Sequence, residues 1–306
     1  QRWSTKFSRN GTIDPEAGTK NEKNHIKSVN TFLIYIVLIF WAVTTIYPIF
    51  WVISNSFKDK KMIMSDAFSL PLGKLFTTAN YTDAFSKMNI LNAYKNSIII
   101  SGCVAAVVIL LAGMASFALV RYSFKGSKLL YNIVIAAMMF PVFSTIIPVF
   151  RMEFGWGIAG SGKTWMSLLS VILPQIAGNM AFAIVVLTGY IRSLPIDLEE
   201  AAFMEGCNAY QIFFKVIMPL TKPSFAAVGI FSFLWSYNDL FTQQFFLRNK
   251  DEWAITRLLL EISSKEGTNY GLMAAVVTLV VVPLLIVYVC LQKYIVKGMT
   301  AGAVKG

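Results

Sequence analysis

The sequence has few of the side chains that enzymes and metal sites commonly use. It contains three cysteines, Cys103, Cys207 and Cys290, which lie far apart and form no CxxC pair. This spacing predicts neither a metal site nor a disulfide framework. The single histidine, His25, lies in a polar stretch, so we expect no histidine-based catalysis. We therefore expect no catalytic residue, no metal and no cofactor in this chain.

Charged residues are also scarce, at 14% of 306 residues, whereas soluble globular proteins carry about 25%. Hydrophobic residues make up 56% of the chain, and the mean hydropathy is +0.60. This composition predicts a membrane protein. The net charge of +11 is compatible with nucleic-acid binding, but Lys and Arg also gather at the ends of membrane spans. We expect a basic integral membrane protein in contact with lipid, and no nucleic-acid partner.

Six apolar segments are each long enough for the ~20 residues that cross a ~30 Å hydrocarbon core. They lie at residues 31–54, 94–120, 128–151, 166–191, 220–240 and 270–294. Small residues such as Gly113 in the second segment suit close helix packing. Prolines in the third and fourth segments predict kinks inside a bundle: Pro141, Pro148 and Pro174. The predicted fold is an all-α polytopic membrane protein with six transmembrane helices.

Three regions follow from this pattern. Residues 1–30 form a polar tail, residues 31–294 the six-span domain, and residues 295–306 a second short tail. Six spans place both tails on one side of the membrane. Lys and Arg are slightly more numerous in the segments that are cytoplasmic when both tails are cytoplasmic, and the positive-inside rule favours that orientation.

The most informative stretch is residues 194–219, a polar island between the fourth and fifth segments. Pro195 suits the first turn of a helix. Three acidic residues crowd that turn, where the helix dipole favours negative charge: Asp197, Glu199 and Glu200. Gly206 offers a break, and Asn208 with Gln211 resembles a capping box. The stretch predicts a helix, a glycine turn and a second helix, although a plain amphipathic connector fits the same pattern.

Five residues of this stretch fall in one spacing, E-A-A-x3-G followed by a closing proline: Glu200, Ala201, Ala202, Gly206 and Pro219. The spacing resembles the EAA loop of the permease subunits of ABC importers. Val216 and Met218 stand where that family prefers Ile and Leu. The chain is most similar to the carbohydrate branch, which includes the smaller permease of the maltose importer, over residues 30–306.

The resemblance implies a cytoplasmic coupling helix in residues 194–219, which docks in a groove of an ATPase subunit. It also implies a second homologous permease, two ATPase subunits that bind ATP and Mg, and an extracellular sugar-binding protein. The chain is then a transporter subunit in the cell membrane and no enzyme. Its glycine-rich end at 297–306 resembles the tail of carbohydrate permeases, which reaches toward the ATPase pair; a disordered basic terminus is the alternative.

Polar and aromatic residues gather on the fourth and fifth segments. Six of them are predicted to line a sugar path: Gln175, Asn179, Trp235, Asn238, Asp239 and Gln243. Amide or carboxylate groups bind sugars together with aromatic rings, but the same residues also suit helix–helix hydrogen bonding. An apolar run on the third segment fits a gate, with lipid-facing or core packing as the alternative: Met138, Met139, Phe140 and Phe143.

Residues 157–164 match the nucleotide-binding expression G-x4-G-K-[ST] letter for letter. That chemistry needs a β-strand before the loop and a helix after it. Here the preceding segment is a predicted membrane span, and the predicted topology places the loop outside the cell. We read a flexible glycine–serine turn that binds no nucleotide.

Two alternatives to sugar import remain open. One is an ABC permease for another solute, such as a peptide or polyol. The other is an ion-coupled secondary carrier, which would need ionisable residues inside the membrane. Only Asp239 lies near the end of a predicted span, so the sequence favours a transporter whose energy comes from another subunit.

Overall fold

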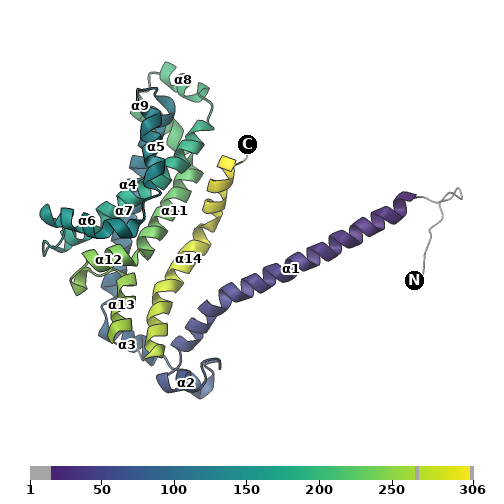
Figure 1. Cartoon of the computed structure of the whole chain (residues 1–306), viewed down its shortest axis with the longest axis vertical. Coiled ribbons are helices and arrows are strands. Elements are labelled where there is room, and N and C mark those ends of the chain that lie inside the picture. Colours follow the sequence, from purple (N-terminus) through teal and green to yellow (C-terminus); the bar gives the residue numbers. More distant parts are fainter. Residues whose placement is uncertain (1–14, 266–268, 304–306) are drawn as a thin grey trace. The chain divides into compact units, whose positions relative to one another are not determined.

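The computed structural model describes residues 15–265 and 269–303, and the described residues are helical with no β-strand among them (Figure 1). The all-α prediction is confirmed. The chain divides into two units, residues 1–54 and residues 55–306.

The first unit consists of helix α1, Pro15–Ser56, which runs across the boundary at residue 54. Its part from Thr31 to Ser56 is long and apolar enough to cross a membrane, and none of its most apolar window is buried within the chain. The helix begins well before the apolar segment. Pro15 suits the first helical position because its missing N–H costs nothing there, and no further proline occurs before Pro48.

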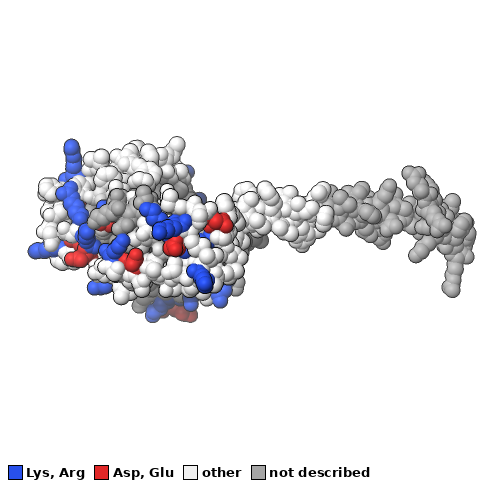
Figure 2. Space-filling view, turned by 90° about the horizontal axis from the view of Figure 1, so that it is seen from below, with Lys and Arg blue, Asp and Glu red and all other residues white. Residues whose placement is uncertain are grey.

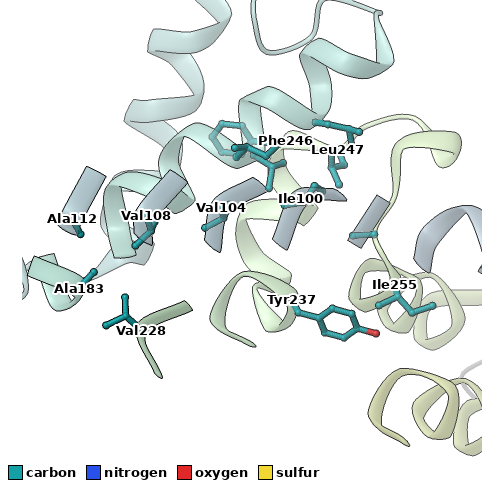
Figure 3. Packing of buried hydrophobic residues seen from close by; sticks show 14 of the residues in the cluster. Ile100, Val104, Val108, Ala112, Ala183, Val228, Tyr237, Phe246, Leu247 and Ile255 are labelled. Carbon is teal, nitrogen blue, oxygen red and sulfur yellow. The ribbon is translucent and has the colours of Figure 1, made fainter. Parts of the chain in front are cut away.

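Four long helices form the centre of the second unit: α4 (Ile90–Arg121), α7 (Thr164–Arg192), α11 (Lys222–Asn238) and α14 (Tyr270–Ala303). Helix α4 packs on α7 and α11, and α11 packs on α14. Their buried aliphatic side chains meet in one core, in which Val104 and Val108 of α4 lie near Ala183 of α7 and Val228 of α11 (Figure 3).

Glycines let these helices approach closely, as the small residues of the second segment predict. A Cβ atom built on Gly113 of α4 would lie 2.5 Å from the Phe225 ring of α11. One built on Gly229 of α11 would lie 2.5 Å from Cδ1 of Ile109 on α4. The α4–α11 contact therefore depends on a missing side chain on each helix.

One predicted span is broken, and another is preceded by a sharp bend. Helices α5 (Ser127–Ala137) and α6 (Val142–Gly155) meet at an angle of 104°, and residues 209–220 meet α11 at 84°. The first break ends at Pro141, whose ring fixes the backbone immediately before α6. By contrast, Pro148 and Pro174 lie inside unbroken helices. The described residues thus hold four single candidate spans, or up to six if each bent pair is one span.

Shorter elements lie at the two ends of this unit. At one end are α2 (Lys60–Ser65), η1 (Gly73–Leu75) and α3 (Ala79–Lys87). The segment between α11 and α14 holds α12 (Leu240–Phe246), η3 (Lys250–Glu252) and α13 (Ile255–Lys265), and α12 packs on α6, α7 and α13. At the other end are α8 (Asp197–Met204), α9 (Ala209–Ile212), the π-helix η2 (Phe213–Ile217) and α10 (Met218–Leu220). Figure 1 shows α8 and α9 at the end opposite to α2 and α3.

The end with α2 and α3 is a charged surface, on which Lys and Arg side chains lie among Asp and Glu (Figure 2). A buried amide holds it together. Asn80 of α3 donates hydrogen bonds to the carbonyls of Ser56, at 2.8 Å, and Lys58, at 2.7 Å. Gly271 of α14 packs on the same amide, where a Cβ would lie 2.8 Å from Nδ2 of Asn80. Residues 55–93 are thereby joined to the last long helix.

Candidate functional site

The loop between α7 and α11 begins with α8, which ends in a glycine turn. Gly206 has a φ of +82°, and its N–H donates to the carbonyl of Phe203 at 2.9 Å. The N–H of Cys207 donates to the carbonyl of Ala202 at 3.0 Å. These two bonds define a Schellman motif, in which a left-handed residue closes the helix. The helix therefore breaks at Gly206 as predicted, and the left-handed backbone conformation at this position favours glycine.

The second half of the loop begins with the predicted capping box. The Asn208 side chain accepts from the N–H of Gln211 at 3.0 Å, and the Gln211 side chain accepts from the N–H of Asn208 at 2.9 Å. The helical path then continues through the π-helix to α10, where Pro219 is exposed. The interpretation of Pro195 was wrong by two positions: α8 starts at Asp197, and Pro195 precedes its N-cap, Ile196.

Burial divides the loop into an inner and an outer face. Ala202, Ile212, Phe213 and Ile217 are buried in the main hydrophobic core. The outer face exposes the predicted Glu200 and Ala201. Beside them are four large apolar side chains that are also exposed: Leu198, Phe203, Met204 and Tyr210. Phe203 is 69% and Met204 85% exposed, so the tip of the loop presents apolar surface on a firmly packed base.

Arg121, the last residue of α4, holds the loop in place. Its Nε pairs with Oε1 of Glu199, and its Nη2 donates to the carbonyl of Leu194 at 3.0 Å. Sequence reasoning missed this residue, which looks like an ordinary cation at the end of a span. The sequence shows an arginine at the end of one span and carboxylates in a later loop. Arg121 and Glu199 are 78 residues apart, and the sequence alone does not say that they meet.

The predicted sugar-path residues do not form one surface. Gln175 and Gln243 are buried and are bonded to protein groups. Gln175 donates to Oδ2 of Asp239 at 2.8 Å and accepts from Oγ of Ser236 at 2.5 Å. Gln243 donates to the carbonyl of Ser236 at 3.2 Å and accepts from the Thr256 hydroxyl. These amides join α7 to the break between α11 and α12.

The other predicted path residues differ in exposure. Asn179 is buried and donates to the carbonyl of Gln175 at 2.7 Å. Trp235 is 48% exposed, and its ring centroid lies 4.9 Å from that of Phe182. Asn238 is exposed and bonded to the carbonyl of Leu234. Trp235 and Asn238 are therefore the members of the set with surface available to a passing ligand.

The predicted gate residues lie at the break between α5 and α6. Met138, Met139, Phe140 and Phe143 are all exposed. The Phe143 ring stands edge-on to Phe241 of α12, with centroids 4.8 Å apart. Phe241 follows the break between α11 and α12. The apolar run thus lies at the bend between α5 and α6 and contacts α12 through Phe143.

Residues 157–164 lack the framework of a nucleotide-binding loop. They connect helix α6 to helix α7, so a helix stands where the strand is required. Gly157, Gly160 and Gly162 have φ values of +73°, +71° and +74°, as in a glycine turn. Among the described residues, no group of three or more His, Cys, Asp or Glu side chains is arranged to hold a metal ion.

The chain is similar to known proteins over most of its length. Residues 108–301 match the family described as "Binding-protein-dependent transport system inner membrane component". The diacetylchitobiose uptake system permease protein of Streptomyces coelicolor is 33% identical over 268 residues, which are 87% of this chain and 86% of that protein. The arabinooligosaccharides transport system permease protein of Bacillus subtilis is 28% identical over 286 residues, covering 92% and 99% of the two chains.

A chain of a bacterial ABC transporter that imports the acidic polysaccharide alginate has a similar fold. Its TM-score is 0.74 at 21% identity, over 87% of this chain and 96% of that chain. Together with the family match and the S. coelicolor relative, this fold confirms the resemblance drawn from residues 194–219. The chain belongs to the family of binding-protein-dependent transport system inner membrane components, the permease subunits of ABC transporters.

Proposed function

We propose that this chain is one permease subunit of an ATP-driven importer of oligosaccharides, and that residues 194–219 are its coupling element. The observation that carries the proposal is the tip of the loop. Phe203 and Met204 are exposed beside Glu200 and Ala201, while the other face of the loop is packed into the core. Exposed apolar patches rimmed by polar residues mark protein interaction sites.

The chemistry of the tip fits an ATPase subunit. Apolar side chains such as Phe and Met are enriched in interface cores, and the small Ala201 lets another backbone approach closely. Glu200 lies in the first turn of α8 with its carboxylate exposed. A carboxylate in this position can form a charge-assisted hydrogen bond with a basic residue of the partner.

The assembly then has a defined direction. With the coupling loop in the cytoplasm, α2 and α3 at the opposite end lie outside the cell. Helices α5 and α6 count together as one span and α11 as another, while residues 209–219 belong to the cytoplasmic loop. With α1, α4, α7 and α14, this gives six spans with both termini in the cytoplasm. The partners are a second homologous permease, two ATPase subunits that bind ATP and Mg, and an extracellular sugar-binding protein. A relative structure was determined with an alginate pentasaccharide-bound periplasmic protein, which supports the last partner.

The substrate class rests on the relatives and on two side chains. The relatives above are named for diacetylchitobiose and arabinooligosaccharides. Trp235 and Asn238 offer an exposed aromatic ring and an exposed amide on neighbouring turns of α11, the groups that hold a neutral sugar. A permease for small osmoprotective compounds is the second candidate, because a relative from Synechocystis carries that name at 32% identity over 231 residues.

Gly206→Asp tests the coupling element. A Cβ at φ +82° costs about 1 kcal/mol, a factor of about five in population, and the new carboxylate joins the outer face beside Glu200. The purified variant should insert normally, lose most of its ATPase subunits and fail to transport. Gly162→Asp is the matched control, because its φ of +74° carries the same strain in another loop. Normal ATPase retention and transport by Gly206→Asp would show that this loop is not the coupling element.

Uptake by the reconstituted complex identifies the substrate class. Proteoliposomes supplied with ATP should accumulate radiolabelled diacetylchitobiose or an arabino- or galacto-oligosaccharide, and Trp235→Ala and Asn238→Ala should reduce that uptake. Trp156→Ala is the control, since Trp156 is also exposed, at 62%, but lies outside the long helices. Uptake of a compatible solute alone would favour the second candidate. Uptake driven by an ion gradient without ATPase subunits would make the protein a secondary carrier.

A further inference from the structure

One stripe of helix α4 makes the contacts that hold the loop against the bundle. Gly113, Phe117 and Arg121 are spaced four apart and therefore lie on one face of the helix. The Phe117 ring centroid lies 5.8 Å from that of Phe213 in the π-helix. A Cβ on Gly113 would lie 3.1 Å from Cζ of the same Phe213 ring. The stripe therefore contacts the second half of the loop through packing.

Arg121 contacts the first half of the loop through polar groups, and we call its bonds to Leu194 and Glu199 the Arg121 clamp. Its guanidinium bonds to the carbonyl of Leu194, just after α7 ends, and to the carboxylate of Glu199 in the first turn of α8. Both side chains of the ion pair are only 11% exposed. The planar fork of arginine suits two acceptors held at a fixed angle, which a lysine ammonium does not reproduce. One side chain thus joins the ends of α4 and α7 to the start of α8.

The two neighbouring carboxylates lie in different surroundings. Glu199 is buried against Arg121, whereas Glu200 is exposed on the tip. Successive helix residues are rotated by about 100°, so one can bind the bundle while the next remains free for a partner. The loop therefore has separate residues for attachment to this chain and for contact with another.

We propose that Arg121 and Glu199 are positioning residues for energy coupling: they fix α8 to α4, so that a displacement of α8 moves the bundle with it. This inference rests on the proposed coupling role of residues 194–219. Coupling between distant sites is carried by contiguous packed and hydrogen-bonded groups. Helix α4 packs on both α7 and α11, so a clamp at its end reaches three long helices. Without the clamp, α8 can be displaced while α4, α7 and α11 stay in place.

The test compares transport with ATP hydrolysis in the complete complex, reconstituted with its partner permease, ATPase subunits and binding protein. The probe is radiolabelled diacetylchitobiose, or the labelled oligosaccharide of the panel above that the wild type accumulates. Arg121→Met and Glu199→Gln should retain their ATPase subunits and hydrolyse ATP. Sugar transported per ATP should fall by about five-fold or more, the lower end of ordinary coupling effects. Arg121→Lys should recover part of the loss, because it keeps the charge but not the fork.

Arg192→Met is the matched control. Arg192 is the last residue of α7 and is exposed, with its guanidinium over the Tyr131 ring, so its loss should leave the sugar-to-ATP ratio unchanged. An unchanged ratio in both Arg121→Met and Glu199→Gln would overturn the proposal. Loss of the ATPase subunits in both variants would also overturn it, because the pair would then serve docking. Failure of the proposed function is seen separately, as normal ATPase retention by Gly206→Asp.

Discussion

At the scale of single residues, the two adjacent glutamates of α8 show how position decides role. The sequence places both in the first turn of a helix, and the structure does so too. Only the structure shows that Glu199 is bonded to Arg121 while Glu200 remains exposed. The spacing that resembles the EAA loop contains Glu200, so the sequence pointed to the outward-facing residue and passed over the inward-facing one.

This difference predicts unequal effects on stability. Glu199→Ala leaves the Arg121 charge buried without its carboxylate, and removal of one partner of a buried ion pair costs about 3–5 kcal/mol. Glu200→Ala removes an exposed side chain and should change stability by no more than about 0.5 kcal/mol. Thermal unfolding of the purified variants in detergent measures both. Equal shifts in Tm would contradict the burial assigned to Glu199.

Gly113 gives a second residue-scale prediction. Gly113→Ala places a Cβ 2.5 Å from the Phe225 ring, and such overpacking costs about 1–3 kcal/mol. Gly102→Ala is the control in the same helix, because its Cβ would meet nothing within 4 Å. We expect a lower Tm for Gly113→Ala alone. If both variants unfold at the wild-type temperature, α4 and α11 are not as close as the structure has them.

At the scale of elements, the sequence predicted those features of the loop that depend on residues close together in the chain. The acidic first turn of α8, the turn at Gly206 and the capping box at Asn208 all depend on residues within a few positions of one another. The sharp break before Pro141 was predicted only as a kink, because composition gives no angle. The Arg121 clamp and the buried Gln175 network join residues more than 60 positions apart, and no periodicity reveals such contacts.

The element formed by residues 58–67 predicts a pH dependence. Lys58 is fully buried, with Nζ 3.2 Å from the carbonyl of Ala67, and burial lowers the pKa of its ammonium while nearby Asp66 partly opposes this. Between this lowered pKa and the usual lysine value of about 10.4, the unfolded state binds more protons than the folded state, so stability rises with pH.

Lys58→Met should abolish that rise. The Tm of the wild type relative to this variant should increase as pH is raised toward 10, and Lys60→Met, at an exposed position, should leave the trend intact. Parallel curves for the wild type and Lys58→Met would mean that Lys58 has the same pKa in the folded and unfolded states.

At the scale of the whole molecule, the second unit has two different ends. The proposed coupling loop and the charged end with α2 and α3 lie at opposite ends of the second unit (Figures 1 and 2), and the described residues hold four to six candidate spans. Family membership follows from the comparisons. The composition alone predicted a membrane protein. The spacing from Glu200 to Pro219, together with the scarcity of ionisable residues in the predicted spans, pointed to energy supplied by other subunits.

The central claim is that residues 194–219 contact an ATPase subunit on the cytoplasmic side. The most direct measurement places a photo-crosslinker on Met204→Cys, the most exposed apolar side chain of the tip, in a background with the native cysteines replaced, and identifies the captured protein by mass spectrometry. The account predicts that the crosslinker at Met204→Cys captures an ATPase subunit. A crosslinker on Lys163→Cys, in the loop between α6 and α7, should capture no ATPase subunit. Capture of the sugar-binding protein at Met204→Cys, or of no partner in the assembled complex, would contradict it.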